Sequence, residues 1–264
     1  MRVAAERQAI ASYDVALKLP ANLLELPPNE VVAYRKAFPI QECGEPLLEL
    51  PSDFLRVDPH PYAGLGAPYN NCSPFSLRSG VIQRLKHAAQ LLDERHPGHR
   101  LLIADCYRPI AVQRYMIEHT LNELARAEQL NPATLSPETR ARLSAQVLSI
   151  WSQPSEDPNA PPPHSTGGAI DLTIATPDGA RLEMGSPLDA FPPEGLPDHF
   201  ASYSDAPSKR FHTNRQLLRS VMCGAGFVQL PWEWWHFSYG DQWWGLLKTF
   251  SGAPVRAALY GRAA

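Results

Sequence analysis

Apolar residues recur at helical spacing in several stretches of the chain. After Ser79 they fall three or four residues apart, at Val81, Ile82, Leu85, Ala88, Ala89 and Leu92. This spacing places them on one face of a helix, which Pro97 and Gly98 end. The same period predicts helices over residues 111–129, 137–151 and 214–223.

Short apolar runs between these stretches predict buried strands. They cover residues 100–105, 169–174, 227–230 and 234–239, with a weaker candidate at 54–57. Residues 153–163 are rich in proline and fit no regular element, so we predict a loop there. Helices and strands are intermixed without a regular βαβ order, which favours an α+β fold. Residues 1–75 are expected to be rich in loops.

The composition excludes several classes of protein. The 264 residues carry 24 Lys and Arg against 27 Asp and Glu, so the net charge of −3 lacks the basic excess of nucleic-acid binders. No run approaches the ~18 apolar residues of a membrane-spanning helix. Apolar residues make up 44% of the chain, which is enough for a buried core. We therefore expect a folded protein with neither a nucleic-acid nor a membrane partner.

The N-terminal residues and the cysteines bear on the compartment. Charged and polar residues interrupt the first 20 positions, so the apolar core of a secretory signal is missing. The four cysteines, Cys43, Cys72, Cys106 and Cys223, lie far apart and form no Cys-x-x-Cys pair. We therefore expect reduced thiols and a cytoplasmic rather than a periplasmic protein.

Three distant residues suit a metal site. His164 ends the proline-rich loop, while Asp171 and His236 lie in predicted strands. Two imidazoles and one carboxylate are a usual protein set for catalytic zinc, with a fourth position left for water. A bound cation would also offset the cost of burying the Asp171 carboxylate. Taken singly, however, such residues are most often structural or exposed.

Glu233 is a candidate general base near that site. A carboxylate close to a metal can take a proton from water and later pass it to a leaving amine. Residues three apart in a regular strand point to opposite faces, so Glu233 and His236 cannot both face one metal from a strand. We therefore predict a turn or bulge within residues 231–234.

Arg108 follows a predicted strand and precedes Pro109. Its guanidinium would there face the negative charge that develops on an attacked carbonyl. Asp105, three residues earlier, would orient this guanidinium through a charge-assisted pair. The alternative is an ion pair that only supports the fold.

The remaining histidines show no ligand-like spacing. We interpret them as surface residues: His60, His87, His96, His99, His119, His199 and His212. The tryptophans at 232, 234, 235, 243 and 244 are interpreted as core residues or as the wall of a cleft.

Four segments together resemble the zinc D-Ala-D-Ala peptidases and, within them, the dipeptidase branch. They are Asp-x-Tyr-Arg-Pro at 105–109, His-Ser-x-Gly-x-Ala-Ile-Asp-Leu-Thr at 164–173, Met-Gly-Ser at 184–186 and Glu-Trp-Trp-His-Phe at 233–237. The resemblance implies a hedgehog/D-Ala-D-Ala-peptidase-like fold, with a central antiparallel sheet and flanking helices. It implies a single domain over residues 1–264.

The resemblance also implies roles for the residues of the site. One zinc ion would be held by His164, Asp171 and His236. Glu233 would act as general base and acid, and Arg108 would stabilise the oxygen of the scissile carbonyl. The reaction implied is hydrolysis of the dipeptide D-alanyl-D-alanine to two D-alanines.

Substrate recognition is expected to involve further acidic residues. A dipeptidase must bind a free ammonium group, which in a closed pocket needs a carboxylate partner. The resemblance suggests Asp189 for this role, with Asp205 and Glu183 as alternatives. Asp105 is also counted among the substrate-binding residues.

Two features depart from the family pattern. Prolines occupy 161–163, where the family usually has a serine just before the first zinc histidine, so a hydroxyl contact to the substrate carboxylate is expected to be lost. The segment at about 122–160 is longer than in the family. We expect it to form a helical insertion that serves as a lid or as an interaction surface.

Two other functions stay open at this point. A D,D-carboxypeptidase acting on peptidoglycan stem peptides would use the same metal chemistry, and the missing export signal argues against it. A zinc-stabilised binding module would keep the metal without hydrolysis, and the presence of Glu233 and Arg108 argues against that. The dipeptidase chemistry would serve either recycling of D-Ala-D-Ala or removal of a glycopeptide antibiotic's target.

Overall fold

The structure is a computed structural model that describes residues 19–149, 151 and 153–263. Most of the stretch behind the expectation about a secretory signal, residues 1–18, lies outside these residues. Within the described part, no helix combines the length and the apolar character needed to cross a membrane.

A five-stranded sheet lies at the centre of the molecule, in the order β2-β4-β5-β7-β6. Its strands are β2 (Leu55–Arg56), β4 (Arg100–Asp105), β5 (Ala169–Ala175), β6 (Val228–Gln229) and β7 (His236–Ser238). Neighbouring strands are antiparallel except β2 and β4, which run parallel. The α+β class with a central antiparallel sheet is therefore confirmed, with one parallel pairing at its edge. A separate two-stranded sheet joins β1 (Leu47–Glu49) to β3 (Ser76–Arg78).

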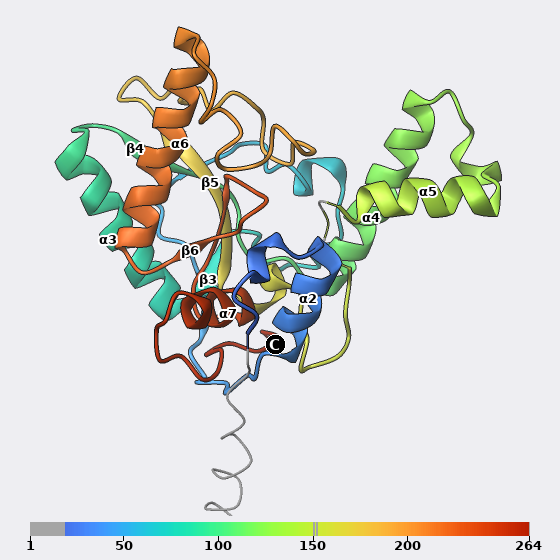
Figure 1. Cartoon of the computed structure of the whole chain (residues 1–264), viewed down its shortest axis with the longest axis horizontal. Coiled ribbons are helices and arrows are strands. Elements are labelled where there is room, and N and C mark those ends of the chain that lie inside the picture. The colour runs from blue at the N-terminus through green and yellow to red at the C-terminus, as the bar shows by residue number, and fades with distance from the viewer. Residues whose placement is uncertain (1–18, 150, 152, 264) are drawn as a thin grey trace, which may run out of the picture.

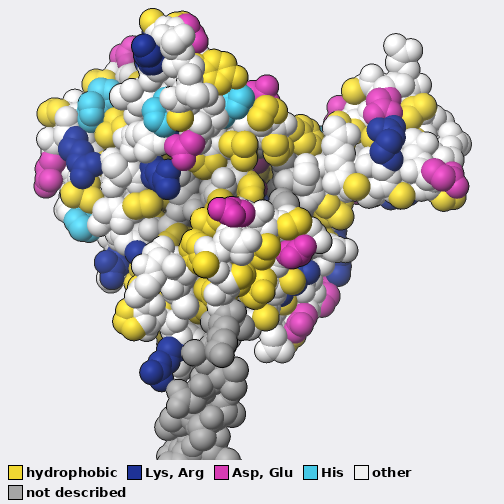
Figure 2. Space-filling view, viewed as in Figure 1, with side chains coloured by type: hydrophobic (Ala, Val, Ile, Leu, Met, Phe, Trp, Pro, Cys, Tyr) yellow, Lys and Arg dark blue, Asp and Glu magenta, His cyan; other side chains and the backbone are white. Residues whose placement is uncertain are grey.

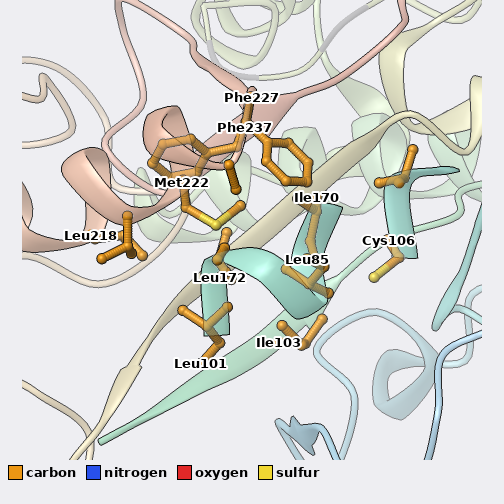
Figure 3. Packing of buried hydrophobic residues seen from close by; sticks show 14 of the residues in the cluster. Leu85, Leu101, Ile103, Cys106, Ile170, Leu172, Leu218, Met222, Phe227 and Phe237 are labelled. Carbon is orange, nitrogen blue, oxygen red and sulfur yellow. The ribbon is translucent and has the colours of Figure 1, made fainter. Parts of the chain in front are cut away.

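The helices α3 (Ser79–Arg95) and α6 (Ala206–Gly224) pack against this sheet (Figure 1). Figure 3 shows the side chains between them, among which are Leu85, Leu101, Ile103, Ile170, Leu172, Leu218 and Met222. Side chains alternate along a strand, so Ile170 and Leu172 enter this core while Asp171 faces the other side of β5. The hydrophobic core thus fixes the strand whose opposite face carries Asp171.

Two of the helix boundaries differ from the sequence prediction. α6 begins at Ala206 rather than at 214, because the Asp205 carboxylate accepts the Ser208 backbone N–H at 2.9 Å and caps the helix. The predicted helix over 137–151 ends at Val147. The helix at 79–95 and the strand at 100–105 agree with the prediction.

An arm of two helices projects from the body of the molecule (Figures 1 and 2). It consists of α4 (Ile110–Ala127) and α5 (Pro137–Val147), joined through η3 (Pro132–Thr134). These helices share a small core of their own, made of Val112, Met116, Leu121, Ala125, Leu143 and Val147. Both helices point away from the sheet, so they do not form a lid over it. Tyr62 and Trp151 continue this core toward the body.

Two helices have no counterpart in the sequence prediction. α2 (Pro28–Ala37) lies in the region expected to be rich in loops, and α7 (Gln242–Phe250) follows the last strand. The two helices pack together around Val31, Phe38 and Leu246. At Gly245 a Cβ would lie 2.3 Å from the Phe38 ring, so the close contact requires glycine. The apolar residues of the ten-residue helix α2 show too weak a helical spacing to predict it. Packing against α7 supplies the stability of this helix instead.

Candidate active site

Three adjacent strands place candidate side chains in one row. Asp171 of β5 pairs with His236 of β7 on one side and with Asp105 of β4 on the other. The register between β4 and β5 shifts between Ile103 and Asp105, and this irregularity sets Asp105 rather than Ala104 opposite Asp171. Side chains that face each other across strands lie close together. The row is therefore a direct result of the strand register.

His164 reaches this row from η4 (Pro163–Thr166), a short 3-10 helix just before β5. Its Nε2 lies 3.2 Å from Asp171 Oδ2 and 3.2 Å from His236 Nδ1. Asp171 Oδ1 lies 3.0 Å from His236 Nδ1. Gly167 ends η4 with a φ of +72°, and a Cβ there would come within 2.5 Å of the Leu47 side chain. The turn that delivers His164 therefore requires glycine.

A hydrogen bond on the far side of the His164 ring determines which ring nitrogen carries the proton. His164 Nδ1 lies 2.7 Å from the carbonyl oxygen of Cys106. A carbonyl oxygen can only accept, so Nδ1 carries the proton and donates it. In the neutral ring, Nε2 then keeps its lone pair and directs it toward Asp171.

A longer chain of hydrogen bonds fixes His236. Its Nε2 lies 3.3 Å from Ser238 Oγ, and Ser238 Oγ donates to Asp241 Oδ2 at 2.8 Å. Because the Ser238 hydrogen is engaged with Asp241, its oxygen accepts the proton of His236 Nε2. The lone pair of His236 Nδ1 therefore stays available and points toward Asp171 and His164.

The resulting set of donors fits a divalent cation. The ligand atoms of His164, Asp171 and His236 all lie within 4.8 Å of one another, and no other such group occurs among the described residues. Although burial opposes ionisation, the neighbouring imidazoles hold the pKa of Asp171 below its ordinary value. Two nitrogen lone pairs and a carboxylate that converge in a buried space repel one another unless a cation lies between them. Two imidazoles and one carboxylate are ligands that zinc prefers.

Glu233 lies in the turn that the sequence spacing requires. β6 ends at Gln229 and β7 begins at His236, and the backbone N–H of Glu233 bonds to the carbonyl of Leu230 between them. Glu233 Oε2 lies 3.7 Å from His236 Nδ1. Burial raises the pKa of Glu233 to about 8. A cation beside it would favour the carboxylate and lower this pKa again.

Arg108 is held beside the row by several partners. Its Nε and Nη2 donate to Asp105 Oδ2 at 3.0 and 2.7 Å, and its Nη1 donates to Gln113 Oε1 at 3.0 Å. Nη2 also lies 3.5 Å from Asp171 Oδ2. Although burial opposes it, the Asp105 charge raises the pKa of Arg108 above its ordinary value. The guanidinium is therefore a fixed cation next to the candidate metal ligands.

Asp105 does not line the cleft, although the sequence analysis counted it among the substrate-binding residues. Only 1% of its surface is exposed, and it lies behind the Arg108 guanidinium. The hydrogen bonds from Arg108 to Asp105 fit the other role expected for Asp105, which is to orient the Arg108 guanidinium. The Arg108 guanidinium lines the cleft and bonds to the Asp105 carboxylate, which it separates from the cleft.

Asp189 faces the cleft, whereas its two rivals do not. Tyr62 donates its hydroxyl proton to Asp189 Oδ2 at 2.9 Å, and burial raises the pKa of Asp189 to about 6. Asp205 is the exposed N-cap of α6. Glu183 forms an exposed ion pair with Arg210 at 2.8 Å. Of the three carboxylates considered for the substrate ammonium, only Asp189 lines the cleft.

The cleft over the row is small: its free space is about 400 Å³, and this includes the open solvent at its mouth. Trp151, which follows α5, and Trp243 of α7 belong to its wall. The Trp151 ring lies 4.9 Å from the Arg108 guanidinium and 5.3 Å from the Tyr62 ring. Neither Tyr62 nor Trp151 lies in a recognisable motif, so the sequence analysis did not find them. The arm therefore contributes to the site through the residue that follows it.

His60 is buried, which corrects its interpretation as a surface residue. It is 7% exposed, and its Nε2 lies 3.1 Å from Asp105 Oδ1. An isolated histidine without ligand spacing carries no local sign of burial, because the contacts that enclose it come from distant segments. The tryptophans agree better with expectation, since Trp234 and Trp235 are core residues and Trp243 lines the cleft. All four cysteines are free, and only Cys106 is buried.

The prolines before His164 are anchored from outside the cleft. Arg35 of α2 donates to the carbonyl oxygen of Pro161 at 2.9 Å. Gln242 of α7 donates to the carbonyl oxygen of Asn159 at 2.8 Å. The two helices that the sequence did not predict thus hold the loop that carries the first candidate ligand.

The chain is similar to several known proteins. The chain is 41% identical over 215 residues to the D-alanyl-D-alanine dipeptidase of Synechocystis, covering 79% of this chain and 87% of that protein. It is 31% identical over 159 residues to the D-alanyl-D-alanine dipeptidase of Enterococcus faecalis, covering 59% of this chain and 67% of that protein. Among solved structures, the LD-carboxypeptidase LdcB aligns with a TM-score of 0.43 and 13% identity, over 82% of this chain and 77% of that one. The model of one peptidase family matches residues 56–255, and the chain therefore belongs to the Peptidase_M15 family, described as D-Ala-D-Ala dipeptidase.

Proposed function

We propose that this chain hydrolyses the dipeptide D-alanyl-D-alanine to two D-alanines with one zinc ion. The observation that carries the proposal is the convergence of His164, Asp171 and His236 within 4.8 Å, in a small cleft shared with Glu233 and Arg108. Membership of the dipeptidase family supports the choice of substrate. When bound, zinc supplies a Lewis acid for the scissile carbonyl and makes water a stronger acid.

Glu233 handles the proton in this proposal. Its carboxylate lies on the cleft side of the His236 ring, where it accepts a proton from the attacking water. The same carboxyl group then donates that proton to the amine of the departing D-alanine. Its enclosed position favours both steps, because a raised pKa makes the carboxylate a stronger base than that of an exposed glutamate and keeps more of the group protonated near neutral pH.

Arg108 and Asp189 handle the charges of the substrate. The fixed guanidinium of Arg108 stabilises the negative charge that develops on the carbonyl oxygen. The Asp189 carboxylate pairs with the free ammonium group of the dipeptide. Because both ends of a dipeptide are charged, a site with a fixed carboxylate at one end selects a free N-terminus.

The small cleft favours a dipeptidase over a D,D-carboxypeptidase. Even when the open solvent at its mouth is included, the free space of the cleft is only about 400 Å³. Trp151 lines it beside Arg108, where a longer peptide would need space, and Tyr62 packs against Trp151. The intact pair of Glu233 and Arg108 argues against a binding module without catalysis.

The test compares two substrates. We expect the zinc-loaded protein to release D-alanine from D-Ala-D-Ala and to leave a stem pentapeptide ending in D-Ala-D-Ala uncut. Metal analysis of the same sample should give one zinc per chain. Cleavage of the pentapeptide alone would establish a carboxypeptidase, and bound zinc without cleavage of either substrate would establish a binding module.

A further inference from the structure

His60 is enclosed although no part of the proposed reaction uses it. It lies just before η2 (Ala63–Leu65), between the rings of Tyr69 at 5.6 Å and Phe75 at 5.0 Å. Both rings meet the imidazole edge to face. A polar ring in such surroundings is costly to bury unless its nitrogens are bonded.

Both nitrogens of His60 have partners, and these partners define its tautomer. Nδ1 lies 3.2 Å from the backbone nitrogens of Tyr62 and of Ala63. Backbone N–H groups can only donate, so Nδ1 accepts and the ring proton lies on Nε2. Nε2 lies 3.1 Å from Asp105 Oδ1, to which it donates.

This donation divides the two oxygens of Asp105 between different partners. Oδ1 accepts from His60 and, at 3.4 Å, from the hydroxyl of Tyr69. Oδ2 accepts both bonds from Arg108. With Oδ1 held, the carboxylate cannot rotate, and Oδ2 stays directed at the guanidinium. His60 thus fixes the orientation of the Asp105 carboxylate, and this carboxylate in turn holds the Arg108 guanidinium.

The same ring also fixes the turn that carries Tyr62. The two N–H groups that Nδ1 accepts belong to the start of that turn. The Tyr62 hydroxyl reaches Asp189, and the Tyr62 ring lies 4.9 Å from the Arg108 guanidinium. The His60 ring therefore contacts both Asp105, which holds Arg108, and the turn of Tyr62, which bonds to Asp189.

We propose that His60 is a positioning residue for the proposed hydrolysis, because it locks Asp105 and with it Arg108, and braces the Tyr62 turn beside Asp189. This inference rests on the proposed function. His60 touches neither the candidate metal ligands nor the cleft. Its effect is therefore expected in kcat, through Arg108, without loss of zinc.

Two variants separate the two bonds of the ring. In His60→Asn, the side-chain oxygen can still accept the N–H groups of Tyr62 and Ala63, but the shorter side chain does not reach Asp105. In His60→Gln, the amide nitrogen takes the place of Nε2 and still donates to Asp105. We expect His60→Asn to lower kcat about tenfold with KM and zinc content unchanged, as for one lost bond to a charged group. We expect His60→Gln to recover most of that loss, and His87→Asn on the exposed face of α3 to behave as wild type.

A double-mutant cycle shows whether His60 acts through Asp105. The loss from His60→Asn should shrink to less than about twofold when Asp105→Ala is already present, because coupled residues are not additive. Equal losses in both backgrounds, unchanged kcat in His60→Asn, or equal losses for Asn and Gln would each overturn the assignment.

A measurement that needs no substrate distinguishes this proposal from the proposed function. The ¹⁵N spectrum of the wild-type His60 ring should show a proton on Nε2 and an accepting Nδ1. A ring protonated on Nδ1 overturns the positioning role even if D-Ala-D-Ala is cleaved. Absence of cleavage by the zinc-loaded wild type, with the expected spectrum, overturns the proposed function and the catalytic part of the positioning role, and leaves the tautomer assignment standing.

Discussion

The two sides of the cleft are built in different ways. The metal side, which consists of His164, Asp171, Glu233 and His236, rests on the paired strands β5 and β7 and on the short elements that flank them. The substrate side, which consists of Tyr62, Trp151 and Asp189, comes from irregular segments far apart in the chain. Arg108 lies between the two sides and contacts both. Strand pairing fixes the ligands to one another, whereas the substrate side depends on how distant segments pack.

The largest effect is expected on the metal side, from Glu233→Ala. Without its proton acceptor, turnover of D-Ala-D-Ala should fall about 100-fold to 10,000-fold. Zinc content should stay at the wild-type level, because all three ligands remain. Release of D-alanine and metal analysis measure the two quantities. Glu183→Ala, which removes an exposed glutamate, is the matched control, and near-normal turnover in Glu233→Ala would remove Glu233 from its role.

The next effect concerns the residue between the two sides. Arg108→Lys keeps a positive charge but loses the planar group that bonds to Asp105 and Gln113 at once. We expect kcat to fall about 100-fold to 1,000-fold, as when a donor to a developing oxyanion is removed. Arg114→Lys alters only an exposed pair with Glu156 and should change nothing. A rise in KM at unchanged kcat would instead assign Arg108 to the substrate side.

On the substrate side, Asp189→Asn should raise KM for D-Ala-D-Ala about tenfold to 100-fold, because the ammonium loses a charged partner. Zinc content should not change, since Asp189 is no ligand. The comparison with an N-acetylated dipeptide sharpens the result, because that substrate has no ammonium and the penalty should vanish. Asp198→Asn, at an exposed site, is the control. An equal penalty on both substrates would argue against the assigned contact.

A smaller effect is expected behind the metal side, where Ser238 connects His236 to Asp241. Ser238→Ala removes the oxygen that accepts the His236 Nε2 proton. Partners of this kind typically change metal affinity about tenfold to 100-fold. Competition with a chelator measures the zinc affinity directly, with Ser220→Ala on the exposed face of α6 as control. At saturating zinc, KM should equal the wild-type value, because the substrate side is untouched; a changed KM would show that the two sides are not separate.

The same contrast explains how much the sequence could predict. The candidate ligands and Glu233 lie in two short motifs, whose residue types suit metal chemistry and whose resemblance to a known family singles them out from other His, Asp and Glu residues. The turn at Glu233 also followed from spacing alone, because a strand cannot place residues three apart on one face. The strands that carry Asp171 and His236 are strongly apolar. Of the five strands of the central sheet, four are predicted near their observed positions, and β2 is the weaker candidate.

Other parts of the site have no local signal. Trp151 lines the cleft, and Tyr62 bonds to Asp189, only because the arm core that both residues belong to packs against the body. The sequence predicts His60 at the surface, since nothing in its own neighbourhood shows that Asp105 lies beside it. The helix α2 depends on its packing against α7, where the Arg35 side chain of α2 bonds to Gln242, 207 positions later in the chain. Such features depend on tertiary contacts that no periodicity records.

The smallest effect concerns stability and tests how tightly the metal side encloses Glu233. In the metal-free protein, burial raises the pKa of Glu233 from 4.5 to about 8. Between these values the folded state keeps the proton while the unfolded state loses it, so the free energy of unfolding falls as the pH rises. The raised pKa of His236 acts in the same direction. We therefore expect Tm to fall between pH 5 and pH 8, by about 2–4 °C for each kcal/mol.

Glu233→Gln isolates the share of this slope that comes from Glu233. The amide does not titrate, so the fall in Tm should be shallower, and only the part from His236 and other groups should remain. Calorimetry of the metal-free wild type and variant across this pH range measures the difference. Identical slopes would mean that Glu233 is as well solvated as an exposed glutamate. That result would contradict the enclosed position that the metal side gives to Glu233.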